Sequence, residues 1–424
     1  MRSAQAIFSS GRARLLGGCL GVALATGCAA GRAVDEVRGA GLDPTPALML
    51  VESWPLETGL DHPEIPDSAA VWRAMFAGAT RSIDLAFFYG ADAPGSILGD
   101  LLKNEIEGAA ARGVRVRVIL DAAFYGRDPA VGERLAATPG IEVRRLDLRA
   151  RTGGVMHAKY FVVDGTDCFL GSMNLDWRSL VHIQELGLRI REPGLAAGIA
   201  ELFELDWALA GGAEIEALRR PSAAPLRVDF EHQGAPHSAS LVISPQGLLI
   251  DESRWDLPRL LEMIEGARSR VRLQVLSYAR LGYGGERFDT LDLALRRAAA
   301  RGVRVEVMVA DWNLRPGGVE DLKALARTPG IEVRFVTIPQ ASAGFIPYAR
   351  VIHAKVLVVD GEAAWLGTSN AGGDYFLKSR NVGVIVRGRG FASEVEGVFE
   401  GLWRGPYARV IDPEATYAPP RIGE

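Results

Sequence analysis

Two copies of one short pattern decide the fold, and they read His157-Ala-Lys-Tyr-Phe-Val-Val-Asp-Gly165 and His353-Ala-Lys-Val-Leu-Val-Val-Asp-Gly361. Other segments repeat in the same order: residues 111–118 recur as 300–307, and residues 138–144 recur as 328–334. Repeats at this long spacing indicate two homologous domains rather than a solenoid of short units. We therefore predict a first domain over residues 46–210, a linker over 211–226, a second domain over 227–410 and a tail over 411–424.

Within each copy, apolar stretches of strand length alternate with segments of helical periodicity. The predicted strands of the first copy are 83–89, 114–121, 141–146, 160–164, 168–171 and 185–191, and its helices are 98–112, 131–137 and 195–210. The second copy has predicted strands 271–278, 303–309, 331–336, 356–360, 364–367 and 381–386, and helices 291–301 and 391–403. This alternation predicts an α/β fold of two α/β/α sandwich domains, with a pseudo-twofold axis relating them.

The composition is that of a globular protein with one unusual bias. The 424 residues are 48% hydrophobic and 24% charged, which excludes a mostly disordered chain or a collagen-like repeat. The net charge of −4 gives no global basic surface for binding nucleic acid. Lysine is scarce, with five residues against 43 arginines. Because Lys159 and Lys355 both lie in the repeated pattern, we expect a role there that arginine does not fill.

The first 28 residues predict an export signal rather than part of the fold. Three arginines precede a short apolar stretch over residues 15–24, and Ala25-Thr-Gly-Cys28 follows. This order is typical of a secretory signal, and its end resembles the lipobox of bacterial lipoproteins, with Ala25 in place of the more usual leucine. We expect a lipidated Cys28 that anchors the protein on the periplasmic or cell-surface side of a membrane; plain secretion and a retained anchor are the alternatives. Cys168, in an apolar stretch, is expected to be buried and inert.

Polar residues follow the two histidines at matching distances. Positions +2, +7, +15, +17 and +28 hold Lys159, Asp164, Ser172, Asn174 and Glu185 in the first copy, and Lys355, Asp360, Thr368, Asn370 and Asn381 in the second. Residues i and i+2 of a strand share a face, so each histidine should project beside its lysine. The chain then turns at Asp-Gly and returns as a hairpin, which brings the +15 and +17 side chains beside the same pair.

Two such clusters meeting at a twofold interface predict a phosphate site. Paired ammonium groups and neutral donors can bind the oxygens of a phosphodiester and stabilise the added charge of a pentacovalent transition state. A single histidine in a strand is more often a core residue, and Asp-Gly is an ordinary hairpin turn. That explanation fits poorly here, because a whole set of polar positions is repeated around two of only six histidines.

The repeated residues match, twice, the HxKx4D and G-S/T-x-N signature of the phospholipase D superfamily, and residues 46–410 resemble a complete bilobal member. Residues 171–180, 184–187, 346–353 and 366–376 are similar to the animal lysosomal phospholipase-D-like 5′-exonucleases and their poxvirus envelope relatives. Residues 174–180 are also similar to bacterial cardiolipin synthases. The animal enzymes rely on disulfides, which the three cysteines of this chain do not provide.

The resemblance implies that one histidine attacks phosphorus to give a covalent phosphohistidine, while the other protonates the leaving oxygen and then activates water or an alcohol. It implies no metal and no cofactor. The expected catalytic residues are His157, His353, Lys159, Lys355 and Glu185; the expected phosphate ligands are Ser172, Asn174, Thr368 and Asn370; and Asp164, Asp360 and Asn381 are expected to support them. The two aspartates, at turns near the lysines, suit structural ion pairing.

The difference at position +28 predicts which histidine is the nucleophile. We expect Glu185 to bind the Nδ1–H of His157 and Asn381 to bind that of His353. A carboxylate makes an imidazole a stronger nucleophile than an amide does, so His157 is predicted to attack. The alternative is that Glu185 pairs with a nearby arginine such as Arg178.

Three functions fit the sequence. The phosphodiester substrate is either a phospholipid, hydrolysed or transferred to an alcohol, or the end of a nucleic acid, with a 5′-exonuclease on single strands as the specific form. An inactive phosphate-binding envelope protein is the third. We expect a monomer, since both half-sites lie in one chain, and contact with a membrane through Cys28.

Overall fold

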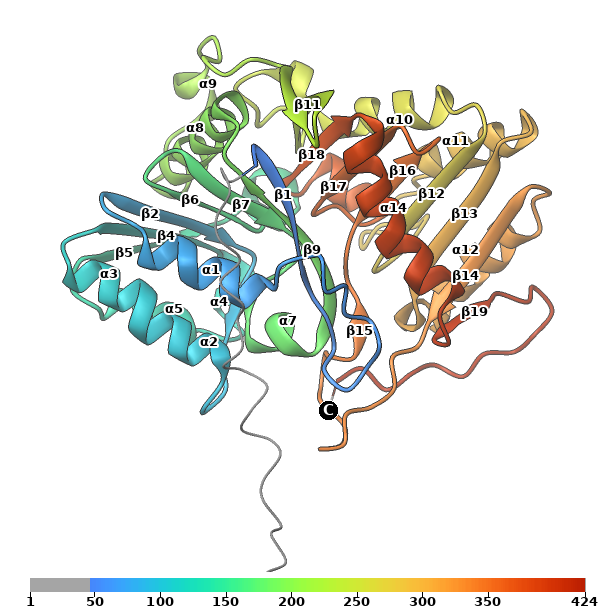
Figure 1. Ribbon diagram of the computed structural model, residues 1–424, viewed down its shortest axis with the longest axis horizontal. Helices are drawn as coiled ribbons and strands as arrows, with labels where there is room; N and C mark the ends of the chain where they lie inside the picture. Colours follow the sequence, from blue (N-terminus) through green and yellow to red (C-terminus); the bar gives the residue numbers. More distant parts are fainter. Residues whose placement is uncertain (1–45, 424) are drawn as a thin grey trace, which may run out of the picture. The chain divides into compact units, whose positions relative to one another are not determined.

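The computed structural model describes residues 46–423, and two large sheets dominate it (Figure 1). The first sheet has the order β1-β9-β7-β6-β2-β4-β5, and the second has the order β10-β11-β18-β17-β16-β12-β13-β14-β19. The order of the first sheet is repeated in the second, from β11 to β14, so the internal repeat of the sequence is a repeat of topology. We call residues 48–210, which build the first sheet, lobe 1, and residues 228–410, which build the second, lobe 2.

The strands of lobe 1 are β1 Leu48–Ser53, β2 Ser82–Phe87, β3 Gly90–Ala91, β4 Arg115–Asp121, β5 Ile141–Leu146, β6 Tyr160–Val163, β7 Asp167–Gly171, β8 Leu175–Asp176 and β9 Ile183–Ile190. Its helices are α1 Ser68–Ala77, α2 Ile97–Asp100, the π-helix η1 Leu101–Glu107, α3 Gly108–Ala111, α4 Ala122–Tyr125, α5 Ala130–Ala136, α6 Arg149–Thr152, α7 Trp177–Val181 and α8 Pro193–Ala210. The short helix α9 Ile215–Leu218 follows.

The strands of lobe 2 are β10 Val228–His232, β11 Ala235–Ser244, β12 Arg270–Val275, β13 Arg304–Ala310, β14 Ile331–Val336, β15 Val351–Ile352, β16 Val356–Val359, β17 Ala363–Gly367, β18 Asn381–Arg387 and β19 Ala408–Val410. Its helices are η2 Glu252–Arg254, α10 Asp256–Glu265, α11 Thr290–Ala300, η3 Asp311–Leu314, α12 Gly318–Ala326, α13 Gly373–Leu377 and α14 Arg389–Arg404.

Each sheet is mixed. In lobe 1, β2, β4 and β5 run parallel, and β6, β7, β9 and β1 pair antiparallel. Lobe 2 repeats this, with β12, β13 and β14 parallel and the remaining pairs antiparallel. The central parallel strands β2, β4, β12 and β13 are buried along nearly their whole length, whereas β5 and β14 keep partly exposed residues. The predicted class of mixed α/β sheets is confirmed.

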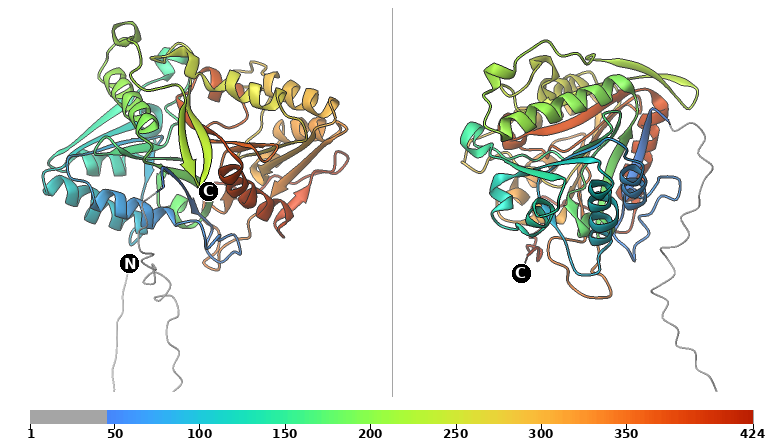
Figure 2. Two further views of the ribbon diagram at one scale, coloured as in Figure 1. Left: turned by 45° about the horizontal axis from the view of Figure 1, so that its top comes forward. Right: turned by 90° about the vertical axis from the view of Figure 1, so that its left-hand side faces the viewer.

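Helices cover both faces of each sheet (Figure 2). In lobe 1, α1 and η1 pack on the face that carries Phe161 and Phe169, while α8 packs on the other. In lobe 2, α10, α11 and α12 cover one face and α14 the other. One hydrophobic cluster contains buried side chains of both lobes, including Leu188 of β9 and Val384 of β18. The two lobes therefore share part of their core.

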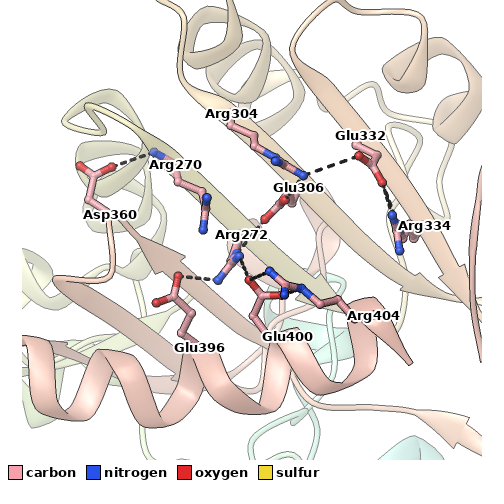
Figure 3. Close-up of polar contacts among 10 residues, drawn as sticks. All are labelled: Arg270, Arg272, Arg304, Glu306, Glu332, Arg334, Asp360, Glu396, Glu400 and Arg404. Atoms are coloured by element: carbon pink, nitrogen blue, oxygen red, sulfur yellow. Dashed lines mark hydrogen bonds and ion pairs between the residues drawn. The ribbon is translucent and has the colours of Figure 1, made fainter. Parts of the chain in front are cut away.

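Arginines of the parallel strands fasten the long closing helices to the sheets. Figure 3 shows Arg272 of β12 between Glu306 of β13 and the helix α14, from which Glu396 and Glu400 point toward it. The side chain of Arg272 is only 3% exposed, and its Nε lies 2.7 Å from Oε2 of Glu306. Lobe 1 repeats this with Arg117. Multiple carboxylates per buried arginine satisfy its fork of donors, which explains the alternation of arginine and valine in these strands.

The predictions for the two cysteine-containing segments, around Cys168 and Cys28, have different outcomes. Cys168 is a free, fully buried cysteine, as expected from its apolar neighbours. The export signal and Cys28 lie outside the described residues. Within residues 46–423, no helix has the length and apolar character needed to cross a bilayer.

Candidate active site

Each histidine of the repeated pattern lies on a segment that pairs with the other lobe. β15, which ends directly before His353, runs parallel to β9 of lobe 1, with Val351 opposite Ile183 and Ile352 opposite Gln184. The amide of His353 then donates to the carbonyl of Gln184 at 2.8 Å. Backbone hydrogen bonds thus join the two lobes at the histidine itself.

His157 is held in the same way by lobe 2. Met156 forms a parallel bridge with Arg380, and the amide of His157 donates to the carbonyl of Arg380 at 2.9 Å. Gln184 and Arg380 each stand one residue before the +28 position. Each histidine ring therefore lies beside the +28 residue of the opposite copy.

In the structure, each histidine is paired with the residue that the sequence assigned to the other histidine. Glu185 Oε2 lies 2.7 Å from Nδ1 of His353, and Asn381 Oδ1 lies 2.9 Å from Nδ1 of His157. The expectation that Glu185 pairs with His157 and Asn381 with His353 is therefore wrong. Its physical reason is the strand pairing between the lobes, which spacing within one copy cannot reveal.

Glu185 is completely buried and makes a second contact through its other oxygen. Oε1 of Glu185 accepts a hydrogen bond from Oγ of Ser179 at 2.9 Å. The alternative partner, Arg178, instead forms an ion pair with Asp176 at 2.8 Å, so that alternative is wrong as well. Burial by itself would raise the pKa of Glu185, but the neighbouring His353 and Lys355 outweigh it and hold this pKa below its ordinary value.

The surroundings of both imidazoles disfavour their protonated forms. Burial and the charges of Lys159 and Lys355 lower the pKa of His157 well below its ordinary value. Burial also lowers the pKa of His353 to about 4, although Glu185 acts in the opposite direction. Because Glu185 and the amide oxygen of Asn381 both accept from Nδ1, the Nε2 atoms of both rings are left for chemistry.

The two lysines are fully buried next to their histidines. Nζ of Lys159 donates to the carbonyl of His157 at 2.5 Å, and Nζ of Lys355 donates to the carbonyl of His353 at 2.6 Å. Burial and the charge of Lys355 lower the pKa of Lys159 well below its ordinary value. Burial lowers the pKa of Lys355 to about 7. Because burial opposes the charge of both ammonium groups, an anion bound beside them would stabilise their charged forms.

The two asparagines present buried polar atoms that have no partner among the described residues. Oδ1 of Asn370 accepts from the amide of Leu276 at 3.1 Å, which leaves Nδ2 of Asn370 unused. Oδ1 of Asn174 is also unpartnered, and a half-turn of that amide would present its Nδ2 instead. Buried polar atoms are normally hydrogen-bonded, so these amides suit the oxygens of a bound phosphate.

The two hydroxyls are used inside the protein. Oγ of Ser172 donates to the carbonyl of Leu186 at 3.2 Å, and Oγ1 of Thr368 donates to Oδ1 of Asn381 at 2.9 Å. Thr368 thereby fixes the amide that orients His157. These contacts position the site, and the phosphate contact expected for both hydroxyls stays a prediction.

Asp164 and Asp360 have a structural role with different partners from those expected. Asp164 accepts hydrogen bonds from the amides of Thr80, Arg81 and Ser82, where β2 begins. Asp360 does the same for the amides of residues 268–270, where β12 begins. The expected ion pairing with the site lysines is wrong, because the Asp-Gly turns lie at the ends of β6 and β16 away from Lys159 and Lys355. Each aspartate instead fastens a neighbouring strand.

Aromatic side chains surround His157, which was not predicted from the sequence. The rings of Phe88 and Tyr375 each lie 5.0 Å from the imidazole of His157, at steep angles to it. Phe88 also lies under Nζ of Lys159 at 5.1 Å and packs against Phe124 at 4.0 Å. The aromatic run Phe87-Phe88-Tyr89 at the end of β2 was the available signal.

A buried ion pair behind His157 was missed as well. Arg380 and Asp206 of α8 are both fully buried, and their side chains lie 2.9 Å apart. The guanidinium also donates to the carbonyls of Ser244 and Leu248, each at 2.8 Å. Since the carbonyl of Arg380 holds His157, this network ties α8 of lobe 1 to the site.

The residues described contain no obvious place for a metal ion. Among residues 46–423, no group of three or more histidine, cysteine or carboxylate side chains lies close enough together to hold one. What the site offers is two imidazoles, two buried cations and two amides with unused polar atoms. This donor set suits a phosphodiester bound between the lobes.

Comparison with known proteins agrees with this chemistry. The family described as "Cardiolipin synthase, PLD-like domain" matches residues 73–207 and 260–403. The human protein named 5'-3' exonuclease PLD3 is 32% identical over 412 residues, covering 88% of this chain and 82% of the relative. The virion nicking-joining enzyme of vaccinia virus, strain Western Reserve, is 31% identical over 360 residues, covering 80% of this chain and 83% of the relative.

A solved structure shows the same fold at much lower identity. Phosphatidylserine synthase of Haemophilus influenzae superposes with a TM-score of 0.60 over 81% of this chain and 85% of its own, at 13% identity. The family match falls on both lobes and includes both histidine–lysine pairs. This chain therefore belongs to the phospholipase D superfamily of phosphodiester-processing enzymes.

Proposed function

We propose that this protein is a phosphodiesterase that cleaves single-stranded nucleic acid from an end, through a phosphohistidine on His353. The observation that carries the chemistry is the composite site, in which each lobe orients the histidine of the other. Support for the substrate comes from relatives that match nearly the whole chain and are named exonucleases. Aromatic rings at the site are also suited to nucleobases.

His353 is the better nucleophile because its Nδ1–H donates to a carboxylate. The ionised Glu185 stabilises positive charge on this ring as its Nε2 bonds to phosphorus. In this step the P–Nε2 bond forms, the bond from phosphorus to the leaving oxygen breaks, and that oxygen takes a proton from Nε2 of His157. The assignment is the reverse of the one drawn from the sequence.

The substrate itself makes His157 a proton donor. In the free protein, burial and two lysine charges oppose protonation of His157. A phosphodiester anion bound between Lys159 and Lys355 offsets those charges and raises the pKa of His157. In the second step, water gives its proton to Nε2 of His157 and attacks phosphorus, the P–Nε2 bond breaks, and His353 is restored.

Phosphatidyl hydrolysis or transfer is the second candidate. The description of the matching family as cardiolipin synthase favours it, and so does the lipid anchor that we propose at Cys28. The reaction at phosphorus is the same for the phospholipid and for the nucleic acid; only the groups esterified to the phosphate differ.

The test compares both substrates with one protein. The purified full-length chain is given an end-labelled single-stranded oligonucleotide and, in parallel, vesicles that contain phosphatidylglycerol. We expect stepwise shortening of the oligonucleotide, absent in His353→Ala and retained in His232→Ala, since His232 lies in β10 and pairs with Glu394. Turnover of phosphatidylglycerol without cleavage of the oligonucleotide would replace the proposal with the second candidate.

A further inference from the structure

A cluster of half-buried aromatic rings lies on one side of the site. Phe88 and Tyr89 follow β2, and Phe124 lies in α4; we call these three residues the aromatic rim. The ring centroids of Phe88 and Phe124 are 4.0 Å apart, and those of Tyr89 and Phe124 are 6.1 Å apart. All three side chains keep part of their surface exposed. Aromatic groups that serve only the core are normally buried more completely.

The rim has no aromatic counterpart at the equivalent positions of lobe 2; Tyr375, the lobe 2 ring that contacts His157, lies elsewhere, in α13. The residues that follow β12, the strand of lobe 2 equivalent to β2, are Leu276 and Ser277. The aromatic residue after β13, Trp312, packs against a separate hydrophobic cluster that contains Phe399. A repeat that conserves the polar residues of both half-sites therefore differs in the apolar residues beside them. This asymmetry indicates that different groups flank the phosphate on its two sides.

The rim is built into the site through Asp121. Oδ1 of Asp121 accepts from the amides of Ala123 and Phe124 and so caps the first turn of α4. Oδ2 of the same side chain accepts from the amide of Met156 at 2.8 Å, directly before His157. One carboxylate thus fixes both the helix that carries Phe124 and the segment that carries the histidine.

A cation completes the rim on its exposed side. The guanidinium of Arg127 lies 4.9 Å from the ring centroid of Phe124, and Arg127 is exposed. Aromatic rings that stack bases, interleaved with arginine that meets the backbone phosphates, are the pattern of surfaces that bind single strands. An acyl chain carries no charged group that this arginine could bind.

We propose that the aromatic rim is the stacking subsite for the nucleoside on the leaving side of the scissile phosphate. This inference rests on the proposed function. The leaving oxygen must approach Nε2 of His157, and Phe88 of the rim is in contact with that imidazole. The base attached to the leaving group therefore meets Phe88 and Phe124, while the group that stays on phosphorus faces the lobe 2 side of the site.

The test removes the ring and the base separately. Oligonucleotides carry either a normal base or an abasic residue at the leaving position, and kcat/KM is measured for wild type and for Phe124→Leu. In wild type, loss of the base is expected to lower kcat/KM about tenfold, as is usual for one stacking contact. In Phe124→Leu, the normal oligonucleotide should lose about the same factor, and removal of the base should then cost nothing more.

Controls separate stacking from damage to the fold. Phe124→Tyr should keep the preference for a base, and Tyr125→Leu in the same helix should behave as wild type, since Tyr125 points toward Gly132 of α5. An equal loss on both oligonucleotides in Phe124→Leu would overturn the inference, and so would a wild type indifferent to the base. Failure of wild type to cleave either oligonucleotide would instead overturn the proposed function.

Discussion

At the scale of single residues, the sequence predicted that Glu185 and Asn381 orient the two histidines, but it assigned each of them to the wrong histidine. The rule that a carboxylate favours the nucleophile depends only on chemistry, and the difference between Glu185 and Asn381 was visible in the sequence. Which ring each side chain meets depends on strand pairing between segments about 170 and 220 residues apart. Offsets counted along one copy carry no information about that pairing.

The corrected assignment predicts where a covalent intermediate forms. Rapid quenching with a labelled phosphodiester should place the label on His353, because its Nδ1–H donates to the ionised Glu185. His157→Ala should still accumulate the labelled form when the leaving group is good, as with p-nitrophenol, and His353→Ala should not. Peptide mapping of the quenched protein identifies the labelled residue. Label on His157 in wild type would mean that His157 is the nucleophile, as the sequence alone suggested.

The lysines predict a second result at this scale. Lys159→Arg should lose nearly all activity, at least about a hundredfold in kcat, although it keeps the positive charge. Lys159 is 0% exposed, with Nζ held between the carbonyl of His157 and the ring of Phe88, so the larger planar guanidinium does not fit. Lys103→Arg is the matched control, since Lys103 is exposed on η1. Equal turnover of the two variants would show that only charge is needed at position 159.

At the scale of helices and strands, the repeated core was predictable and the connections between lobes were not. The long strands of the two sheets follow from apolar runs that end at Gly, Pro or Asp-Gly, and they are β2, β4, β5, β6, β7 and β9 in lobe 1 and β12, β13, β14, β16, β17 and β18 in lobe 2. The two-residue strands β3 and β8 were not predicted. β15 has two residues and pairs only with the other lobe, so it has no pattern of its own. The hairpin of β10 and β11 was not predicted because β11 starts with the exposed residues Ala235 and Pro236 and continues with the buried polar residues His237 and Ser238, so it lacks a clean alternation.

The ion pair between α8 and the segment before β18 can be tested by stability. Asp206→Asn leaves the Arg380 guanidinium charged and without its carboxylate, although both groups are 0% exposed. Removing one partner of a buried pair costs about 3 kcal/mol of unfolding free energy or more. Glu362→Gln breaks the exposed pair with Arg389 and should cost about 0.5 kcal/mol or less. Chemical denaturation of both variants measures the difference; similar small losses would mean that this pair does not fasten the lobes.

At the scale of the whole molecule, duplication explains why the site needs both lobes. Each lobe contributes a histidine, a lysine and the side chain that orients the other histidine, so neither lobe alone contains a complete half-site. The sequence predicted the fold class and the set of polar residues, because both follow from local pattern and repetition. It did not predict the aromatic rim, whose residues come from the segment after β2 and from α4.

The N-terminal segment predicts where the molecule is held. If Cys28 is lipidated, Cys28→Ser should move the protein from the membrane fraction to the soluble fraction without change in specific activity, because the residues of the site, from Phe88 to Asn381, all lie far along the chain from Cys28. Fractionation of producing cells followed by assay measures both. Cys168→Ser is the control for loss of a thiol and should stay with the membrane. Sedimentation of the Cys28→Ser protein with membranes would contradict a lipid anchor.

The last prediction concerns pH, and its sign follows from two groups in the site. His353 must be neutral to attack, and burial lowers its pKa to about 4, so this requirement is lost only as the pH falls through that value. Lys355 must be charged to bind phosphate, and burial lowers its pKa to about 7, so this requirement is lost as the pH rises through that value. Since kcat/KM reports the free enzyme, it should fall as the pH drops below about 4 and as the pH rises above about 7. The proton that His157 must carry is lost on the same alkaline side, because burial and the two lysines lower the pKa of His157 in the free protein.

The profile of kcat should extend further into the alkaline range than that of kcat/KM. A bound phosphodiester anion favours the charged form of Lys355 and raises its pKa in the complex, so the bound enzyme stays competent at a pH where the free enzyme binds poorly. Both constants are measured from pH 4 to pH 9, with the melting temperature recorded at each pH to separate titration from unfolding. A value of kcat/KM that continues to rise above pH 8, with the protein folded throughout, would mean that the buried ammonium of Lys355 keeps its charge without the substrate.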